Sequence, residues 1–158
     1  MPDVKGWIAV VGFDKVVDPF PQAVAALGHP GTAGGHNHDA MVKTVKAARK
    51  DADLVIVAIH WGVELDTKPR DADIALGQRF IEAGADILFG SHSHRLQPMA
   101  VYKGRPIFYS LGNFVWPNFS TAGSTTAVAE IKVTPQGKFV PRLIPAFITS
   151  PGHPVLQG

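Results

Sequence analysis

Two short apolar runs, both followed by histidines, constrain the fold of this chain more than any other feature. The first run covers residues 54–59 and leads into His60, and the second covers residues 86–90 and leads into His92 and His94. Between the two runs, apolar residues recur at helical spacing. Apolar runs of four to eight residues joined by a helix are typical of neighbouring parallel strands in an α/β sheet. The sequence therefore predicts a parallel sheet that carries histidines at its strand ends.

Two amphipathic helices are predicted around these strands. One covers residues 39–50 with Asp39 as its N-cap, and the other covers residues 71–83 and ends at Gly84 as a C-terminal cap. The apolar residues expected on one face of each helix are Met41, Val45, Ala48 and Ala52 in the first and Ala72, Leu76, Phe80 and Ala83 in the second. The basic residues expected to face water are Lys43, Lys46, Arg49 and Lys50.

An earlier apolar run, residues 7–11, ends at Gly12 and predicts a buried strand inside the same sheet. Residues 13–38 contain several prolines and glycines, so we expect a long irregular loop with at most one helical turn at residues 22–27. Strand, helix, strand, helix, strand makes a pair of βαβ units, which indicates right-handed crossovers. Open sheets of this kind bind ligands beyond the carboxyl ends of their strands.

The later part of the chain predicts antiparallel pairing instead. The expected strand pairs are residues 99–102 with 106–109 and residues 126–133 with 139–147. Each pair flanks a short turn that contains glycine, as β-hairpins do. The tail, residues 150–158, is expected to run over the surface. The predicted fold class is therefore α/β, with a βαβαβ parallel sheet followed by antiparallel hairpins.

The composition limits the classes of protein that the chain can belong to. It has 158 residues, 46% hydrophobic and 18% charged, which suits a single domain over residues 1–158. Its 15 basic and 13 acidic residues form no block of like charge, which argues against a nucleic-acid partner. The lack of cysteine excludes disulfides and thiolate metal sites and leaves the compartment open. No apolar run reaches the ~20 residues that span a bilayer, so we expect no membrane segment in this chain.

The three histidines are the main candidates for chemistry. Imidazoles that converge at strand ends suit Zn, Mn or Fe, bound together with carboxylates and water. His92 and His94 are two residues apart, and in extended backbone they would point to the same side. His60 is expected at the neighbouring strand end, although lone histidines are often purely structural. Glu64 and Asp66 follow closely enough to orient a ligand imidazole, or else they are solvated loop carboxylates.

Three further side chains and one motif carry weaker signals. Asn113 ends a predicted strand, where it either faces the same cleft or forms a turn. Arg95 and Lys68 can hold an anionic substrate, although surface charges often have no specific partner. Residues 34–39 read Gly-Gly-His-Asn-His-Asp, but a helix start accounts for this polar cluster better than a metal site does. Neither a Gly-rich phosphate loop nor a serine-hydrolase elbow occurs.

Four segments together resemble the CapA-type capsule-synthesis (poly-γ-glutamate) proteins, a branch of the calcineurin-like metallophosphatase superfamily. The segments are residues 54–64, residues 82–86 (Glu-Ala-Gly-Ala-Asp), residues 90–98 (Gly-Ser-His-Ser-His-Arg-Leu-Gln-Pro) and residues 104–114. The resemblance implies a layered sandwich of two sheets flanked by helices. Its matching segments lie in the later half of that fold, so the chain resembles the C-terminal portion of a larger CapA-like domain.

The resemblance also implies a metal site. His60, His92 and His94 correspond to the histidine ligands that the later half of a two-metal centre contributes. In that superfamily two ions, of the Mn, Fe or Zn type, polarise a phosphate ester and generate a bound hydroxide for in-line attack. The family's earlier Gly-Asp, Asn-x-Glu and Asn-Asn-His elements do not occur before Trp7. We therefore expect the metal site to be only partly formed in this chain.

The function expected from this resemblance is capsular or envelope polymer biosynthesis, with a polymer or a phosphoester as substrate. His60, Glu64, Arg95 and Asn113 are then the expected catalytic residues. The alternative, from another class of protein, is a non-catalytic binding or assembly module in polymer synthesis or export. The family suggests the cell envelope or the extracellular space as the location. Exposed apolar edges of a partial sandwich are expected to cause self-association.

Overall fold

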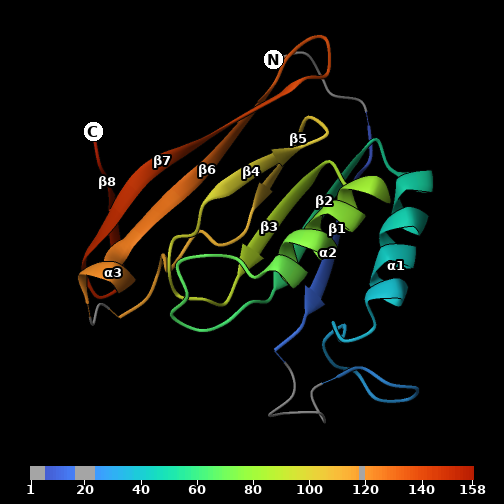
Figure 1. Cartoon of the computed structure of the whole chain (residues 1–158), viewed down its shortest axis with the longest axis horizontal. Coiled ribbons are helices and arrows are strands. Elements are labelled where there is room, and N and C mark those ends of the chain that lie inside the picture. The colour runs from blue at the N-terminus through green and yellow to red at the C-terminus, as the bar shows by residue number, and fades with distance from the viewer. Residues whose placement is uncertain (1–5, 17–23, 118–119) are drawn as a thin grey trace.

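The computed structural model describes residues 6–16, 24–117 and 120–158. It contains two β-sheets, with the two longer helices on one side and a short third helix beside the smaller sheet (Figure 1). The larger sheet contains, in spatial order, β1 (Ile8–Asp14), β2 (Leu54–His60), β3 (Ile87–Ser91), β5 (Arg105–Phe108) and β4 (Met99–Tyr102). The smaller sheet contains β6 (Thr125–Val133), β7 (Phe139–Ser150) and β8 (His153–Leu156). The helices are α1 (His38–Asp51), α2 (Asp71–Glu82) and the short α3 (Thr121–Ser124).

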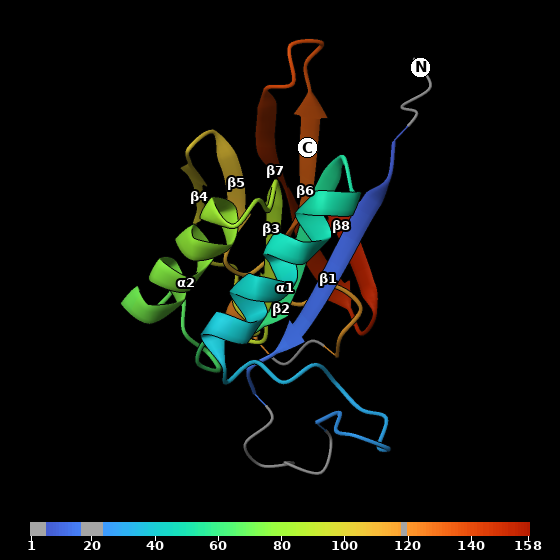
Figure 2. The same ribbon diagram turned by 90° about the vertical axis from the view of Figure 1, so that its right-hand side faces the viewer.

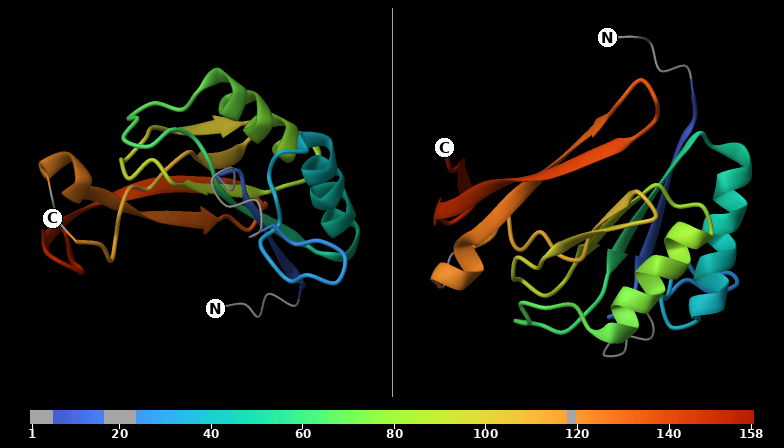
Figure 3. Two further views of the ribbon diagram at one scale, coloured as in Figure 1. Left: turned by 90° about the horizontal axis from the view of Figure 1, so that it is seen from below. Right: turned by 45° about the horizontal axis from the view of Figure 1, so that its top comes forward.

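The predicted fold class is confirmed. In the larger sheet β1, β2, β3 and β5 are parallel, and β4 pairs antiparallel with β5. The smaller sheet is antiparallel throughout. Both α1 and α2 lie against the same face of the larger sheet (Figure 2). The layers therefore follow the order helices, larger sheet, smaller sheet (Figure 3).

Alternation along β2 explains how the middle layer joins its two neighbours. Val55, Val57 and Ile59 point to the helical side, where they are buried with Met41 of α1 and Phe80 of α2. A buried side chain of this size stabilises the fold by about 1.5–3 kcal/mol. The intervening residues of β2 point to the smaller sheet, and His60 continues their alternation. This places the imidazole of His60 on the side of the smaller sheet, away from the helices.

A second apolar cluster joins the two sheets. Its buried members are Ile87 of β3, Phe108 of β5 and Phe139 of β7. Phe108 also stacks on Phe89 with ring centroids 5.3 Å apart. Because this cluster includes strands from both sheets, it fixes the smaller sheet over the middle of the larger one.

Strand β1 lies at the edge of the larger sheet, so the expectation that residues 7–11 form a strand inside the sheet was wrong. Ile8 and Val10 are 58% and 67% exposed. Their side of β1 contributes no residue to the apolar cluster between the sheets, as far as the described residues go. An apolar, β-branched run predicts a strand, but it carries no information on how many neighbours the strand has.

The start of α1 also differs from the prediction. Asn37 is the N-cap, since its side chain accepts a hydrogen bond of 3.0 Å from the backbone N–H three residues later. Asp39, the predicted cap, lies in the first turn and forms an ion pair with Arg79 of α2. Arg49 does not simply face water, because it forms an ion pair of 2.7 Å with the buried Asp86.

Three smaller expectations were also wrong. The tail forms β8 against β7 instead of running free over the surface. In α2 Ala72 is exposed, whereas Asp73 is buried, and its ion pairs with Lys15 and Arg70 offset the cost of burying its charge. Val24 and Ala26 form isolated β-bridges and residues 24–27 form no helical turn, while residues 22 and 23 lie outside the described part of the chain. Within the described ranges, no helix is both long and apolar enough to cross a membrane.

Candidate functional site

The carboxyl ends of β2 and β3 bring two of the predicted histidines into contact. β2 ends at His60 and β3 ends at Ser91, so His92 is the first residue beyond its strand. The His60 Nε2 atom lies 3.0 Å from His92 Nδ1, and His60 Nδ1 lies 3.1 Å from the Ser91 hydroxyl. The two imidazole planes meet at 66°. Both nitrogens of His60 therefore have a fixed neighbour.

His92 and His94 are not in extended backbone, which corrects the geometry expected from their spacing. Their φ angles are +107° and +54°, so both lie in the left-handed region. Such a conformation in a residue with a side chain costs about 1–3 kcal/mol and persists only where surrounding contacts impose it. The buried Ser93 provides two of these contacts: its carbonyl accepts from the Leu65 N–H at 2.7 Å, and its hydroxyl donates to the Arg95 carbonyl at 3.0 Å.

This bend turns His94 away from the other two histidines and toward Asn113. The rings of His92 and His94 are 6.4 Å apart, whereas His94 Nδ1 lies 2.6 Å from Asn113 Oδ1. The Asn113 amide nitrogen donates to the Gly123 carbonyl at 3.0 Å, so the amide oxygen is the atom that faces His94. Neutral His94 therefore carries its proton on Nδ1 and its lone pair on Nε2. Asn113 thus faces the cleft, and the structure assigns it a defined contact there.

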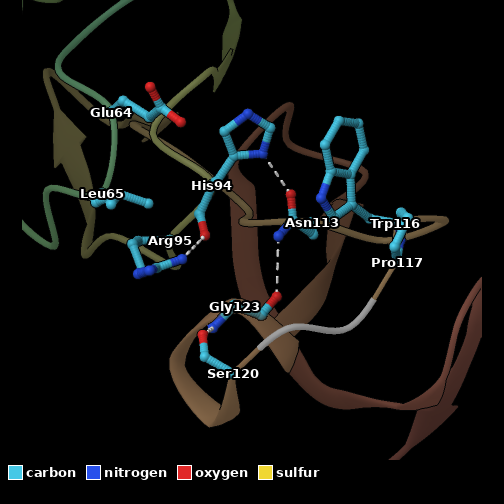
Figure 4. A pocket seen from close by; sticks show the side chains of 9 residues that line it. All are labelled: Glu64, Leu65, His94, Arg95, Asn113, Trp116, Pro117, Ser120 and Gly123. Atoms are coloured by element: carbon cyan, nitrogen blue, oxygen red, sulfur yellow. Dashed lines mark hydrogen bonds between the residues drawn. The ribbon is translucent and has the colours of Figure 1, made fainter.

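A cavity of about 270 Å³ lies beside His94 (Figure 4). Glu64, Leu65 and Arg95 line one part of it, and Trp116 lines another part together with Asn113. The Trp116 ring lies 4.9 Å from the His94 ring, at a tilt of 40°. Sequence reasoning missed Trp116, because no pattern around it distinguishes a cavity wall from an exposed loop residue.

The two loop charges of this cavity are not neutralised by neighbours. Arg95 donates from one terminal nitrogen to the His94 carbonyl at 2.8 Å. Among the described residues, no carboxylate lies within ion-pair distance of Arg95, and no hydrogen bond joins Glu64 to an imidazole. Asp66 and Lys68 do not line the cavity, and their backbone carbonyls accept hydrogen bonds from the buried Gln97 side chain.

The surroundings of His92 favour its neutral form. Burial is the main cause of its lowered pKa, and the charges of His60 and His94 lower that pKa further, while Glu64 and Asp14 oppose the shift. Asp14 lies at the end of β1, paired in register with His60. It therefore stands beside the histidines at the same edge of the sheet. Sequence reasoning missed Asp14 because the apolar run appeared to end two residues earlier, at a glycine.

The described residues form only part of a metal site. No group of three or more metal-ligating side chains gathers at one point within the described part of the chain. The 3.0 Å between the nitrogens of His60 and His92 nevertheless suits two neighbouring ligands of one ion, since each would lie ~2.0–2.1 Å from it. His94 stands apart from this pair. His60 and His92 can therefore supply two ligands to one ion, and the described residues do not complete its coordination.

Close packing next to His60 holds the ends of β2 and β3 in place. Trp61 is buried, and its ring nitrogen donates to the Tyr109 carbonyl at 3.0 Å. This hydrogen bond passes over Gly90, where an added Cβ would lie 2.1 Å from the Tyr109 oxygen and 2.3 Å from the Trp61 nitrogen. Gly90 is therefore required for the close approach of β3 to the residues on both sides of it.

Comparison with known proteins agrees with the resemblance found in the sequence. The family described as bacterial capsule synthesis protein PGA_cap matches residues 8–118. The chain is 37% identical over 143 residues to the capsule biosynthesis protein CapA of Bacillus anthracis, a match that covers 87% of this chain and 34% of that protein. It is 41% identical over 96 residues to the PGA biosynthesis protein CapA of Bacillus subtilis (strain 168), covering 61% of this chain and 25% of that protein.

The match to a third relative covers less of the chain. The chain is 35% identical over 77 residues to a probable polyglutamine synthesis accessory protein of Mycobacterium tuberculosis, a match that covers 49% of this chain and 20% of that protein. The chain thus spans about a third or less of the length of the relatives it matches. The family match covers β1 to β5 together with all three histidines and Asn113. On this basis the chain belongs to the bacterial capsule synthesis protein (PGA_cap) family.

Proposed function

We propose that this chain contributes the later part of a divalent-metal hydrolase centre that acts in the synthesis of a capsular polymer such as poly-γ-glutamate. Membership of a capsule synthesis family supports the role in polymer synthesis. The observation that carries the proposal of a metal centre is the contact of His60 with His92 at 3.0 Å, at the ends of two neighbouring parallel strands. When bound, the ion would polarise the substrate and lower the pKa of a bound water.

The proposal divides the three histidines between two ions. His60 and His92 are adjacent and neutral imidazole is favoured at His92, so these two would hold one ion. His94 would hold the second through Nε2, since Asn113 keeps its proton on Nδ1. An amide or carboxylate that accepts the other ring N–H is the usual way in which proteins orient a ligand imidazole. Carboxylate or amide ligands would still be needed to complete the coordination of each ion, since the described residues form no group of three or more ligands.

The remaining catalytic candidates have supporting roles in this proposal. Arg95 would hold an anionic group of the substrate, because its guanidinium lines the cavity beside His94. Glu64 lines the same cavity and would accept or donate a proton there. Asn113 would be a positioning residue, which acts on the substrate only through His94.

Metal content and turnover test this proposal directly. We expect the purified chain to bind Mn²⁺ or Zn²⁺ in elemental analysis, and His60→Ala and His92→Ala each to reduce the bound metal. His153→Ala is the matched control, since His153 is exposed and lies in β8. Turnover of a model phosphodiester with added Mn²⁺ should fall in the same two variants and not in the control. Near-zero metal in the wild type, unchanged by His92→Ala, would contradict the proposal.

A non-catalytic binding module is the second candidate, and one observation favours it. The cavity lies on the Asn113 side of His94, whereas the closest pair of potential ligands, His60 and His92, is not among its lining residues. A cavity that recognises polymer without hydrolysing it would have this arrangement. Binding of a glutamyl polymer without any metal-dependent turnover, in the presence of excess Mn²⁺, would support this candidate over the hydrolase.

A further inference from the structure

We propose that the cavity beside His94 recognises the amino-terminal unit of a γ-linked glutamyl chain, with Arg95 binding its free carboxylate and Glu64 attracting its ammonium group. The choice of a glutamyl polymer rests on the proposed role in polymer synthesis, but the argument for recognition does not require a metal ion. It rests on two unneutralised charges, two apolar walls and the size of the cavity (Figure 4).

Arg95 provides a cation whose side chain is fixed in position but has no described anionic partner. One terminal nitrogen donates to the His94 carbonyl at 2.8 Å, which fixes the side chain. That nitrogen also lies close to Gly123, because a Cβ built there would be 3.4 Å from it. Since no described carboxylate pairs with Arg95, its other N–H groups remain for a ligand. A guanidinium with a free pair of N–H groups matches a carboxylate in two parallel hydrogen bonds.

Glu64 provides the opposite charge in the same cavity. Its side chain is exposed, and it forms no ion pair with Arg95 or with any other cation that the structure describes. A cavity with one cation and one anion that do not neutralise each other favours a ligand carrying both charges. Inorganic phosphate or a second free carboxylate would be attracted by Arg95 and repelled by Glu64, so the pair discriminates against purely anionic ligands.

The apolar walls suit the methylene groups of a glutamyl side chain. Leu65 and Trp116 both line the cavity, and Trp116 is 44% exposed, so part of its ring is open to a ligand. A volume of about 270 Å³ is at or below the lower end for small-molecule sites, which are roughly 300–1,000 Å³. The cavity therefore fits the end of a chain better than a long internal stretch.

The chemistry of a γ-linked polymer identifies which unit carries both charges. In an internal unit the nitrogen is part of an amide, so only the carboxylate is charged. In the amino-terminal unit a free ammonium and a free carboxylate are attached to the same carbon. Only this unit presents the zwitterion that Arg95 and Glu64 together require.

Calorimetric titration of the metal-free chain with the dipeptide γ-glutamylglutamate tests the proposal. We expect the dipeptide to bind, and its N-acetylated form and the form with the first α-carboxylate amidated to bind several-fold more weakly. Arg95→Met should weaken binding of the dipeptide about tenfold or more, and Arg95→Lys by less, because lysine keeps the charge but not the paired N–H groups. Glu64→Gln should weaken binding of the dipeptide but not of its N-acetylated form.

Lys138→Met and Asp51→Asn are the matched controls, since each removes one exposed charge away from the cavity. No binding to the wild type, equal binding of the acetylated dipeptide, or unchanged binding to Arg95→Met would each overturn the proposal. Comparison of the acetylated and free dipeptides needs no variant, so a variant that fails to fold does not decide the outcome. Because the titration uses the metal-free chain, failure of this proposal is distinct from failure of the metal centre, which is tested by metal content.

Discussion

At the scale of single residues, the contact of His94 with Asn113 makes a spectroscopic prediction. Because the Asn113 oxygen faces His94 Nδ1, we expect nitrogen NMR of the metal-free chain to report Nδ1 as the protonated nitrogen of His94. Asn113→Ala removes this acceptor, so the Nε2-protonated form should gain population, as it predominates in free histidine. Equal spectra for the wild type and Asn113→Ala would contradict the assigned orientation of the amide.

Gly90 makes a prediction about stability. In Gly90→Ala the new methyl group would lie 2.1 Å from the Tyr109 carbonyl, so the Trp61 hydrogen bond or the strand itself must shift. Overpacking of this kind costs about 1–3 kcal/mol, measured as the free energy of unfolding in urea. Gly12→Ala is the matched control in β1, because its Cβ would meet no atom within 4 Å. It should change the unfolding free energy by ~0.5 kcal/mol or less.

Residue types and positions could be predicted from the sequence here, but conformations could not. His60 and His92 were expected at neighbouring strand ends, and they lie there because apolar runs predict where parallel strands stop. The left-handed backbone of His92 and His94 was not predictable, since it depends on contacts of Ser93 with residues that are remote or in the same bend. Trp116 was missed for a similar reason, because only the folded loop brings it against His94.

At the scale of elements, two variants at the start of α1 distinguish between Asn37 and Asp39 as the N-cap. Asn37→Ala should lower the free energy of unfolding by about 1 kcal/mol, because it removes the side-chain acceptor of the first turn. Asp39→Ala removes an exposed ion pair and a helix-terminal charge, which together are expected to contribute less, roughly 0.3–1 kcal/mol. If Asp39→Ala were the more destabilising of the two, the cap would be misassigned.

The same helix start makes a prediction about pH. Burial is the main cause of the lowered pKa of His38, and Lys15 and Arg79 lower it further, whereas Asp73 and Asp39 act against the shift. Below about pH 6.5 the unfolded chain therefore binds more protons at this residue than the folded chain does, so stability falls as the pH falls.

His38→Gln tests this pH dependence. The variant should lose less unfolding free energy than the wild type between about pH 7.5 and about pH 5.5. Part of the dependence should remain, because the pKa of His92 is lowered as well. His153→Gln, at an exposed position in β8, is the matched control for the substitution of a histidine by glutamine. An identical pH profile for His38→Gln and the wild type would rule out the proposed contribution of His38.

The pattern of apolar residues explains which helices and strands could be predicted from the sequence. The helices α1 and α2 have apolar residues at the spacing of a buried face, and β2 is a continuous apolar run. The predicted bounds of all three agree with the structure to within about two residues. Strand β8 was missed because it has four residues and follows a Pro-Gly turn, so its sequence resembles a loop. Its pairing depends on the exposed edge of β7, which is a tertiary property.

At the scale of the whole molecule, β1 leaves an apolar edge open to solvent. Trp7, Ile8 and Val10 are all more than half exposed, and β1 has a hydrogen-bonded neighbour on one side within the sheet order. Open edges of this kind favour pairing with another chain. We therefore expect concentration-dependent self-association in sedimentation equilibrium.

Val10→Lys should weaken this association, because a charged side chain would then occupy the open edge. Leu27→Lys is the control, since Leu27 is a fully exposed apolar residue outside the strands of the larger sheet. A wild-type chain that stays monomeric at high concentration would contradict the prediction. The order of strands that creates this edge could not be predicted, because each apolar run looks alike whether it has one neighbour or two.

The bend at His92 and His94 also determines whether this motif can keep its geometry outside the folded protein. A synthetic peptide of residues 87–98 would contain both imidazoles and the arginine in their native order. Freed from the sheet, its backbone would leave the left-handed region, because that region is unfavourable for residues with side chains. Transfer of the histidine arrangement to another scaffold would therefore require the parallel strands and the Leu65 loop as well as the motif.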